Sequence, residues 1–256
     1  MKSLLAFLKK EVTEQIRTGR VIILGSLFVL FGIMNPAVAK LTPWMLDLMG
    51  DALEQSGMVI TSVTVSALDS WMQFFKNIPM ALMVFVLMES NIFTKEYQSG
   101  TLVLSLTKGL TRYKVVVAKT VVLTVLWTMG YWLCFGITYG CNAYFWDNGI
   151  AQNLMFSVVC WWVFGLWVIM LSVFFSTFFR ANIGVLAGTG SVVLAAYLLG
   201  LLPVCKEYVP TLLADGTSLI YAMAEAKSYI CALVIAVVMT ILFFAISISS
   251  FNKKDL

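Results

Sequence analysis

The sequence of 256 residues contains no histidine, and only 12% of its residues are charged. Without histidine the chain cannot build a Ser-His or Cys-His nucleophile pair, an H-E-x-x-H zinc site or a histidine proton relay. It also lacks the G-x-x-x-x-G-K-[ST] loop that holds ATP phosphates in P-loop proteins. We therefore predict that the chain is not an enzyme, has no metal site and binds no ATP itself.

The five cysteines form no C-x-x-C pair, and most lie in or beside apolar runs. This placement favours inert packing residues. Cys141 and Cys205 both fall near the predicted outer face, so a disulfide between them stays open at this stage. The net charge is +4, but no run of Lys and Arg is interleaved with aromatic residues, which argues against a nucleic-acid partner.

Apolar residues make up 61% of the chain, whereas a soluble domain contains roughly 45–50%. A soluble domain of this length cannot bury so much apolar surface, but a helical bundle in lipid can expose it to hydrocarbon. The composition therefore predicts an all-α, polytopic integral membrane protein that forms a single transmembrane domain over residues 1–256.

Six apolar runs are long enough to span a bilayer, at about 21–41, 77–93, 115–144, 154–179, 183–204 and 228–250. Asn35-Pro36 predicts a kink in the first of them. The mixed segments 42–76 and 205–227 are predicted to be extracellular, and the polar, basic segment 94–114 is predicted to be a cytoplasmic loop.

Residues 1–18 are too polar to span a membrane, but their apolar side chains recur at helical spacing. These are Leu4, Leu5, Leu8, Val12 and Ile16, opposite Lys2, Lys9, Lys10, Glu11 and Glu14. The pattern predicts an amphipathic helix in the plane of the membrane interface. No A-x-A-like cleavage site follows it, so we expect it to be retained.

The basic residues are distributed unevenly over the predicted loops. If the N-terminus is cytoplasmic, 13 of the 17 Lys and Arg residues lie inside, and only Lys40, Lys76, Lys206 and Lys227 lie outside. Because basic residues near the ends of spans favour the cytoplasmic side, both termini are predicted to be cytoplasmic in a plasma-membrane protein.

The segment 94–114 is the most informative loop. Gly100 is suited to end a long second helix, Thr101 is suited to cap the next one, and Leu102 and Leu106 belong to an apolar stripe that follows. Two interpretations fit this stripe equally: it docks against a partner, or it packs under the bundle of its own chain.

Glu89 and Asn91 are polar residues near the inner end of the second span. An ionised group costs about 2.5–3.5 kcal/mol at the bilayer centre and less nearer the surface. A functional role for Glu89 and a structural role, in which it hydrogen-bonds to Asn91 or to a neighbouring helix, remain equally open.

Small and aromatic residues mark the later spans. Gly136-x-x-x-Gly140 and Gly184-x-x-x-Gly188 predict close helix packing. The fourth span contains an aromatic cluster, namely Trp161, Trp162, Phe164 and Trp167. This cluster fits either the lining of a path for an amphipathic substrate or a lipid-facing belt.

Several short motifs occur in a recognisable order. K-E-Y-Q-S-G-T-L at 95–102 is followed by L-T-K-G-L-T-R at 106–112 and by Lys119, then by a turn with Arg180 after the fourth span and by F-N-K-K-D-L at 251–256. In this order, and over nearly the whole chain, the sequence resembles the ATP-binding-cassette type 2 (ABC-2) permease family.

The resemblance implies a half-transporter, in which two permeases, identical or related, assemble with two cytoplasmic ATPase subunits that bind ATP and Mg. It implies that the loop after the second span is a coupling helix, and that Glu96 meets basic or backbone donor groups of the ATPase or of the interfacial helix. The coupling residues it assigns are Glu96, Tyr97, Gly100, Thr101, Leu102, Leu106 and Arg112. Arg112 and Lys119 fit the family's basic residues after this helix, although we favour a simpler role as inside-positive anchors.

We therefore expect a permease subunit that exports or flips a hydrophobic or amphipathic substrate, such as a peptide, drug or lipid, using ATP hydrolysed by its partner. Two alternatives remain. A secondary transporter would be expected to show internal repeats and broken or charged helices at the membrane midplane, and no convincing repeat is present. A membrane scaffold without transport activity also fits the composition.

Overall fold

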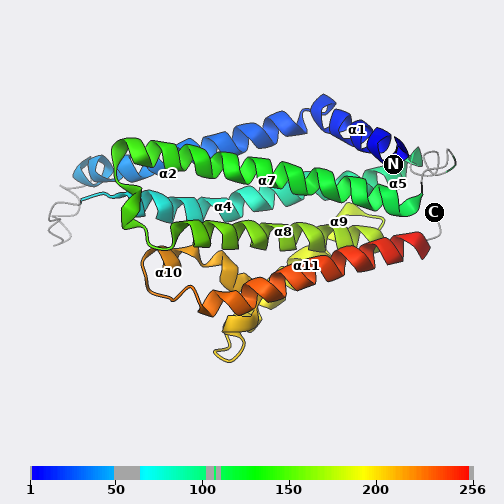
Figure 1. Ribbon diagram of the computed structural model, residues 1–256. Helices are drawn as coiled ribbons and strands as arrows, with labels where there is room; N and C mark the ends of the chain where they lie inside the picture. The colour runs from blue at the N-terminus through cyan, green and yellow to red at the C-terminus, as the bar shows by residue number, and fades with distance from the viewer. Residues whose placement is uncertain (1, 49–63, 102–106, 108–110, 254–256) are drawn as a thin grey trace.

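A computed structural model describes residues 2–48, 64–101, 107 and 111–253 of the chain. The described residues form helices and turns without a strand, and six of the helices are long and apolar enough to cross a membrane. The predicted all-α, polytopic fold is therefore confirmed. The long helices lie side by side in an elongated bundle, and both termini lie at the same end, which we call the terminal end (Figure 1).

The elements follow one another along the chain. The longer helices are α1 (Lys2–Arg17), α2 (Arg20–Leu48), α4 (Ala67–Glu89), α5 (Asn91–Ser99), α7 (Arg112–Phe145), α8 (Leu154–Phe178), α9 (Asn182–Gly200) and α11 (Ser228–Lys253). The short elements are η1 (Asn148–Ile150), η2 (Lys206–Tyr208), η3 (Pro210–Ala214) and α10 (Gly216–Ile220).

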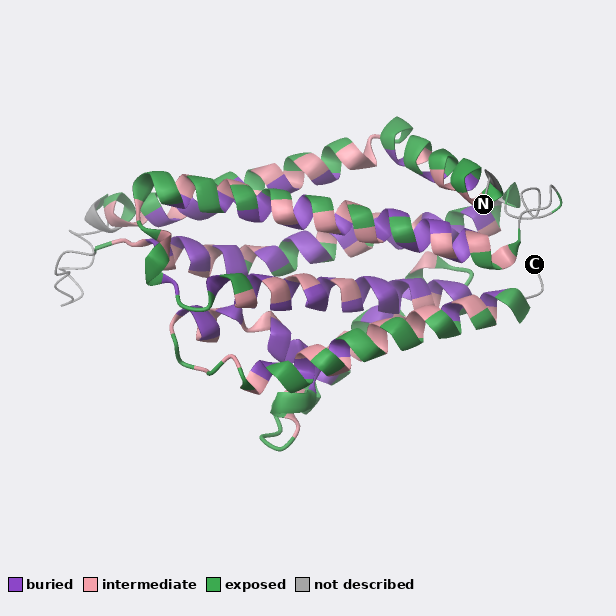
Figure 2. Ribbon diagram, in the orientation of Figure 1, coloured by how far each residue is buried: buried purple, intermediate pink, exposed green. Residues whose placement is uncertain are grey.

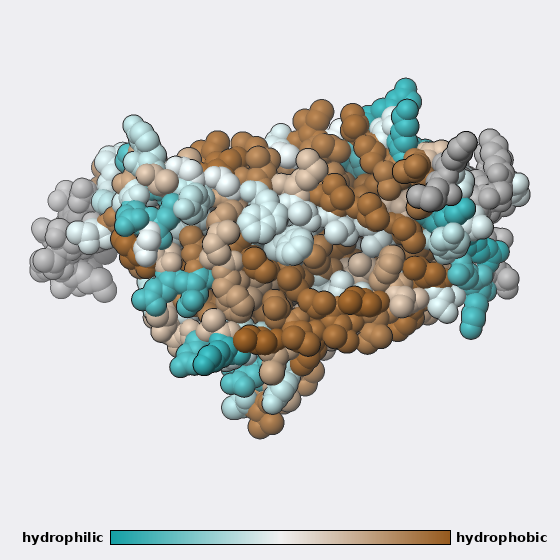
Figure 3. All heavy atoms as spheres, in the orientation of Figure 1, coloured by the Kyte–Doolittle hydropathy of each residue, from teal (hydrophilic) through white to brown (hydrophobic). Residues whose placement is uncertain are grey.

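Helix α8 is the central helix of the bundle. In its most apolar stretch 72% of the residues are buried, against 17% for α9 and α11. Figure 2 shows the same contrast, since α8 is mostly buried while α11 presents a long exposed face. On the surface, apolar side chains cover the middle of the molecule and hydrophilic groups gather toward its two ends (Figure 3). This pattern is the one expected for a helical bundle surrounded by lipid.

Helix α4 begins at Ala67, so it includes residues 67–76, which precede the second span as predicted from the sequence. The Asp69 carboxylate accepts a hydrogen bond from the Ser66 backbone N–H at 2.8 Å, which caps the N-terminus of the helix. The buried Trp71 and Phe74 then pack into the core. The sequence did not reveal this start because the polar face of the first turns lowers the average hydropathy. Residues 42–48 of the predicted segment 42–76 continue α2, and 49–63 lie outside the described residues.

Helix α2 continues through Pro36, which leaves the Gly32 carbonyl without its usual intrahelical donor. Thr138 of α7 replaces that donor, since its hydroxyl donates to the Gly32 carbonyl at 3.0 Å. The Asn35 amide donates to Thr138 Oγ1 at 3.1 Å, and the Asn77 amide of α4 donates to Asn35 Oδ1 at 2.8 Å. This polar network joins α2, α4 and α7 in the apolar interior.

Only one of the two predicted glycine patterns mediates close packing inside this chain. A Cβ atom added at Gly188 would lie 2.7 Å from the Phe175 ring of α8, so this glycine allows α9 to approach α8. At Gly136 and Gly140 a Cβ atom would meet nothing within 4 Å. Their prediction of close packing is therefore wrong within the chain, because this face of α7 points away from the other helices.

The segment between α9 and α11 folds back onto the bundle as η2, η3 and α10. Leu213 is fully buried, and a Cβ atom at Gly216 would lie 2.3 Å from the Phe75 ring, so the segment packs tightly against α4. Cys141 and Cys205 are both free thiols in this structure.

Candidate functional site

Helix α1 lies against the terminal end of the bundle with a polar face directed inward. Phe7, Glu11 and Gln15, spaced four residues apart, are buried, whereas Leu5 and Ile16 are 62% and 56% exposed. The predicted amphipathic helix is present, but Glu11 was wrongly placed on its solvated face. Glu11 is only 2% exposed because basic groups of the bundle meet its carboxylate there.

Six charged residues meet where α1, α5 and α7 come together, and we call them the α1–α5–α7 charge cluster. They are Lys10, Glu11 and Glu14 of α1, Lys95 and Glu96 of α5, and Lys119 of α7. Three acids and three bases balance one another, so the cluster, in which Glu11, Glu96 and Lys119 are buried, carries no net charge.

Lys119 is the most buried member of the cluster, with 1% of its side chain exposed. Its ammonium group donates to Glu11 Oε2 at 2.9 Å and to the Ile92 carbonyl at 2.9 Å. It also lies 3.1 Å from Glu96 Oε2. A lysine ammonium has three N–H donors, and three oxygens from two other helices surround this one. The structure therefore gives Lys119 a specific role in the interior, rather than the surface anchoring that we favoured from sequence.

Glu96 joins α5 to α1 as well as to α7. Its Oε1 atom forms a short ion pair with Lys10, and Lys10 also lies 3.1 Å from Glu11 Oε1. Partial burial disfavours the charged form of Lys10, but the hydrogen bond to Glu96 and the nearby carboxylates outweigh it and raise the pKa of Lys10. Within this chain, Glu96 therefore meets a basic group of α1, the helix that was one of the two partners expected for it.

Glu14 and Lys95 form the solvent-facing side of the cluster. Glu14 Oε1 lies 3.1 Å from the Lys95 ammonium, and both side chains are partly exposed. Burial favours the neutral form of Glu14, but the hydrogen bond from Lys95 and the charge of Lys10 lower the pKa of its carboxyl overall. This second contact between α1 and α5 supports the docked position of α1.

Three carboxylates in the cluster are close enough to resemble a metal site. One oxygen from each of Glu11, Glu14 and Glu96 lies within 4.8 Å of the others. However, the ammonium groups of Lys10 and Lys119 lie among these oxygens and already supply the positive charge. The arrangement is therefore that of an ion-pair cluster rather than of a cation site.

Glu89 and Asn91 form a smaller polar group beside this cluster. The Gln15 amide donates to Glu89 Oε2 at 2.6 Å, and Arg20 Nη1 lies 3.6 Å from the same oxygen. Arg20 Nη2 donates to Asn91 Oδ1 at 2.8 Å. Glu89, which is 2% exposed, therefore contacts α1 and the start of α2 rather than Asn91. The amide donor and the cation both meet Oε2, whereas the buried Oε1 atom has no hydrogen-bond partner among the described residues, so these contacts fit a structural role without deciding between it and a functional one.

The other predicted coupling residues are spread along the same end. Gly100 has φ +67° and ends α5, a left-handed conformation that glycine adopts most easily. The ring centroids of Tyr97 and of Phe251, at the end of α11, lie 6.2 Å apart. Arg112 donates to the Asn252 carbonyl at 3.2 Å. Thr101 is exposed.

Part of the predicted coupling loop, 102–106 and 108–110, is not among the described residues. Leu102 and Leu106, with most of the apolar stripe, lie outside the described residues. Sequence reasoning expected Glu96 to meet basic groups of the N-terminal helix, but it missed the pairing of Glu11 with Lys10 and Lys119. The only sequence signal was a lysine set one to two turns inside an apolar helix, and this signal does not name its partners.

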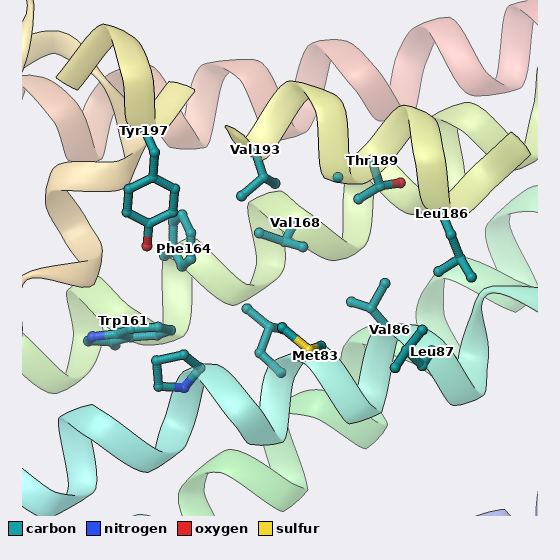
Figure 4. A pocket seen from close by; sticks show the side chains of 13 residues that line it. Met83, Val86, Leu87, Trp161, Phe164, Val168, Leu186, Thr189, Val193 and Tyr197 are labelled. Carbon is teal, nitrogen blue, oxygen red and sulfur yellow. The ribbon is translucent and has the colours of Figure 1, made fainter. Parts of the chain in front are cut away.

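A cavity of about 340 Å³ lies between α4, α8 and α9, away from the charge cluster. Its walls are almost entirely apolar or aromatic: α4 contributes Met83 and Val86, α8 contributes Trp161 and Phe164, and α9 contributes Tyr197 (Figure 4). Trp161 and Phe164 are buried, so their placement in a lipid-facing belt is wrong. The cavity has the chemistry of a site for an apolar group, because it offers few hydrogen-bonding partners.

Six spanning helices with an apolar middle and a polar terminal end define a multi-pass membrane protein. The comparison with protein families then makes the assignment specific: residues 5–226 match the family described as ABC-2 family transporter protein. The chain belongs to this family, which confirms the resemblance seen in the sequence. Neither a curated protein nor a solved structure matches it.

Proposed function

We propose that this chain is the permease subunit of an ATP-driven exporter, powered by a separate cytoplasmic ATPase that binds ATP and Mg. The observation that carries the proposal is membership of the ABC-2 transporter family over residues 5–226. The absence of a P-loop from the sequence supports a separate source of ATP hydrolysis. Two permeases, identical or related, would assemble with two ATPases, with the terminal end of each permease in the cytoplasm.

The substrate we propose is a hydrophobic or amphipathic molecule, such as a peptide, drug or lipid. The apolar cavity between α4, α8 and α9 supports this class, because it favours hydrocarbon over charged groups. In the described part of the chain, α8 and α9 contain no charged residue, and hydrophilic groups gather toward the two ends of the molecule in Figure 3. An apolar route of this kind offers an ion few ligands that could replace its water.

The site of coupling that we propose is α5 with the loop that follows it. Helix α5 lies at the terminal end, ends at Gly100, and is tied through Glu96 to α1 and α7. ATP-driven movement of the partner would shift α5, and the bundle would change between inward-facing and outward-facing states. Such a change requires the partner to bind the two states with different free energies.

The first test is to purify the tagged chain gently from its native membrane and to identify the proteins that accompany it by mass spectrometry. A stoichiometric ATPase with a P-loop is the expected result. Repeated purification without any ATPase, from membranes in which complexes survive, would contradict the proposal and would favour a secondary transporter or a scaffold.

The second test replaces Glu96 with alanine in the purified complex. We expect normal insertion and assembly, but loss of the increase in ATPase rate that the permease gives to its partner, because α5 loses its ties to Lys10 and Lys119. The matched control is Glu225→Ala, which removes an exposed acid between α10 and α11. An ATPase rate in Glu96→Ala equal to that of the control would show that Glu96 does not couple.

A further inference from the structure

Lys119 lies in a position that membrane anchoring of α7 does not explain. An anchoring lysine extends its ammonium group into water or among lipid headgroups, but this one is 1% exposed and points into the protein. Its hydrogen-bond partners, Glu11 and the Ile92 carbonyl, are 108 and 27 positions away in the sequence. The ammonium group therefore joins three elements that the chain connects only through long intervening segments.

The contacts around Lys119 give each of these three elements a separate tie. Glu11 belongs to α1, Ile92 and Glu96 belong to α5, and Lys119 belongs to the terminal end of the 34-residue helix α7. The aromatic rings of Phe7 and Phe93 enclose the ammonium group, with centroids 5.8 and 5.6 Å from Nζ. In such an enclosure, a buried charge without its partners is costly, so the ammonium group favours the arrangement in which α1, α5 and α7 stay together.

We propose that Lys119 is a positioning residue that joins α1, α5 and α7 into one mechanical unit, so that a displacement of α5 is passed to α1 and to the terminal end of α7. This inference rests on the proposed function, in which α5 receives movement from an ATPase. It adds the contacts through which a movement of α5 would reach the other helices. Helix α1 leads into α2, and α7 packs against α2, so the unit reaches two spans besides the α4 span that precedes α5.

The test measures amide hydrogen exchange in the complex with its native ATPase, reconstituted in lipid nanodiscs, with and without a non-hydrolysable ATP analogue. In the wild type, we expect the analogue to change exchange in α5, in α1 and at the start of α7 together. In Lys119→Met, α1 and α5 stay joined through Lys10–Glu96 and Lys95–Glu14. We therefore expect these two helices to respond without the start of α7, which should exchange about tenfold faster in both states because it has lost its contacts with them. Lys119→Arg keeps the charge and should restore the joint response.

A second variant tests whether the contacts of Lys119 matter beyond the charge balance of the cluster. Glu11→Gln with Lys119→Met removes one acid and one base, so the cluster stays neutral while the tie is absent. We expect this double variant to recover much of the thermal stability lost in Lys119→Met, but its α7 should still not respond together with α1 and α5. The matched control is Lys9→Met, which removes an exposed lysine from α1 and should behave as the wild type.

The outcomes are distinct. A joint response that persists in Lys119→Met, or that returns in the neutral double variant, overturns the role of Lys119 while leaving the proposed function standing. An α5 that does not respond to the analogue in the wild-type complex overturns the proposed function, and the role of Lys119 with it. A response of α1 and α5 without the start of α7 in both variants, with the joint response restored in Lys119→Arg, supports the proposal.

Discussion

Gly165 lies at the point where the central helix α8 meets Trp127 of α7. A Cβ atom at position 165 would lie 2.2, 2.4 and 2.6 Å from three atoms of the Trp127 indole ring, closer than nonbonded atoms approach. The ring has little freedom to move aside, because it is fully buried between Phe28 and Phe85, whose centroids lie 5.9 and 5.7 Å away. We therefore expect Gly165→Ala to destabilise the bundle.

The expected magnitude follows from two opposing effects. Overpacking a tight core costs about 1–3 kcal/mol, and the confined ring places this site near the upper end of that range. Alanine is favoured over glycine inside a helix by about 1 kcal/mol, which offsets part of the cost. The net loss of stability should therefore be about 2 kcal/mol.

The free energy of unfolding can be measured for the purified protein by titrating a denaturing detergent into mild micelles. The control is Gly136→Ala in α7, which meets nothing within 4 Å and should be neutral or slightly stabilising. Combining Gly165→Ala with Trp127→Phe should cost less than the sum of the single changes, because the smaller ring leaves room for the methyl group. Wild-type stability in Gly165→Ala would refute the close packing of α7 and α8 at this point.

Two further predictions concern polar groups. Asn35→Ala should lower the free energy of unfolding by about 1–3 kcal/mol, because it removes a hydrogen bond to Thr138 inside the bundle. An unchanged midpoint of unfolding would contradict the polar network that joins α2, α4 and α7. The second concerns pH. Since the pKa of Glu14 is lowered below its ordinary 4.5, its contribution to stability is complete above pH 4.5 and is lost as the pH falls through the lowered value. The difference in thermal midpoint between the wild type and Glu14→Gln should therefore be constant above pH 4.5 and shrink below it. A difference in thermal midpoint that grows as the pH falls would show that the ionised form of Glu14 does not stabilise the fold.

Much of the fold could be predicted because membrane spans are encoded locally. The spans that begin near positions 154, 183 and 228 were placed within a few residues of α8, α9 and α11, since a run of about 20 apolar residues has few alternatives in a bilayer. Gly100 was assigned correctly as the end of a helix because its effect is confined to one backbone position. The start of α4 was missed because its buried aromatic face and its polar face cancel in any average of hydropathy.

The sequence by itself therefore determined the class of the protein, the number of its spans, the amphipathic helix and the order of motifs that places it in its family. Only the tertiary structure decided which charges neutralise one another. Glu11 and Lys119 are 108 positions apart and carry no mark of pairing, yet together they bury two charges at the terminal end. The physical reason is that apolarity is a property of each segment taken alone, whereas the cost of a buried charge depends on which groups surround it in the folded chain.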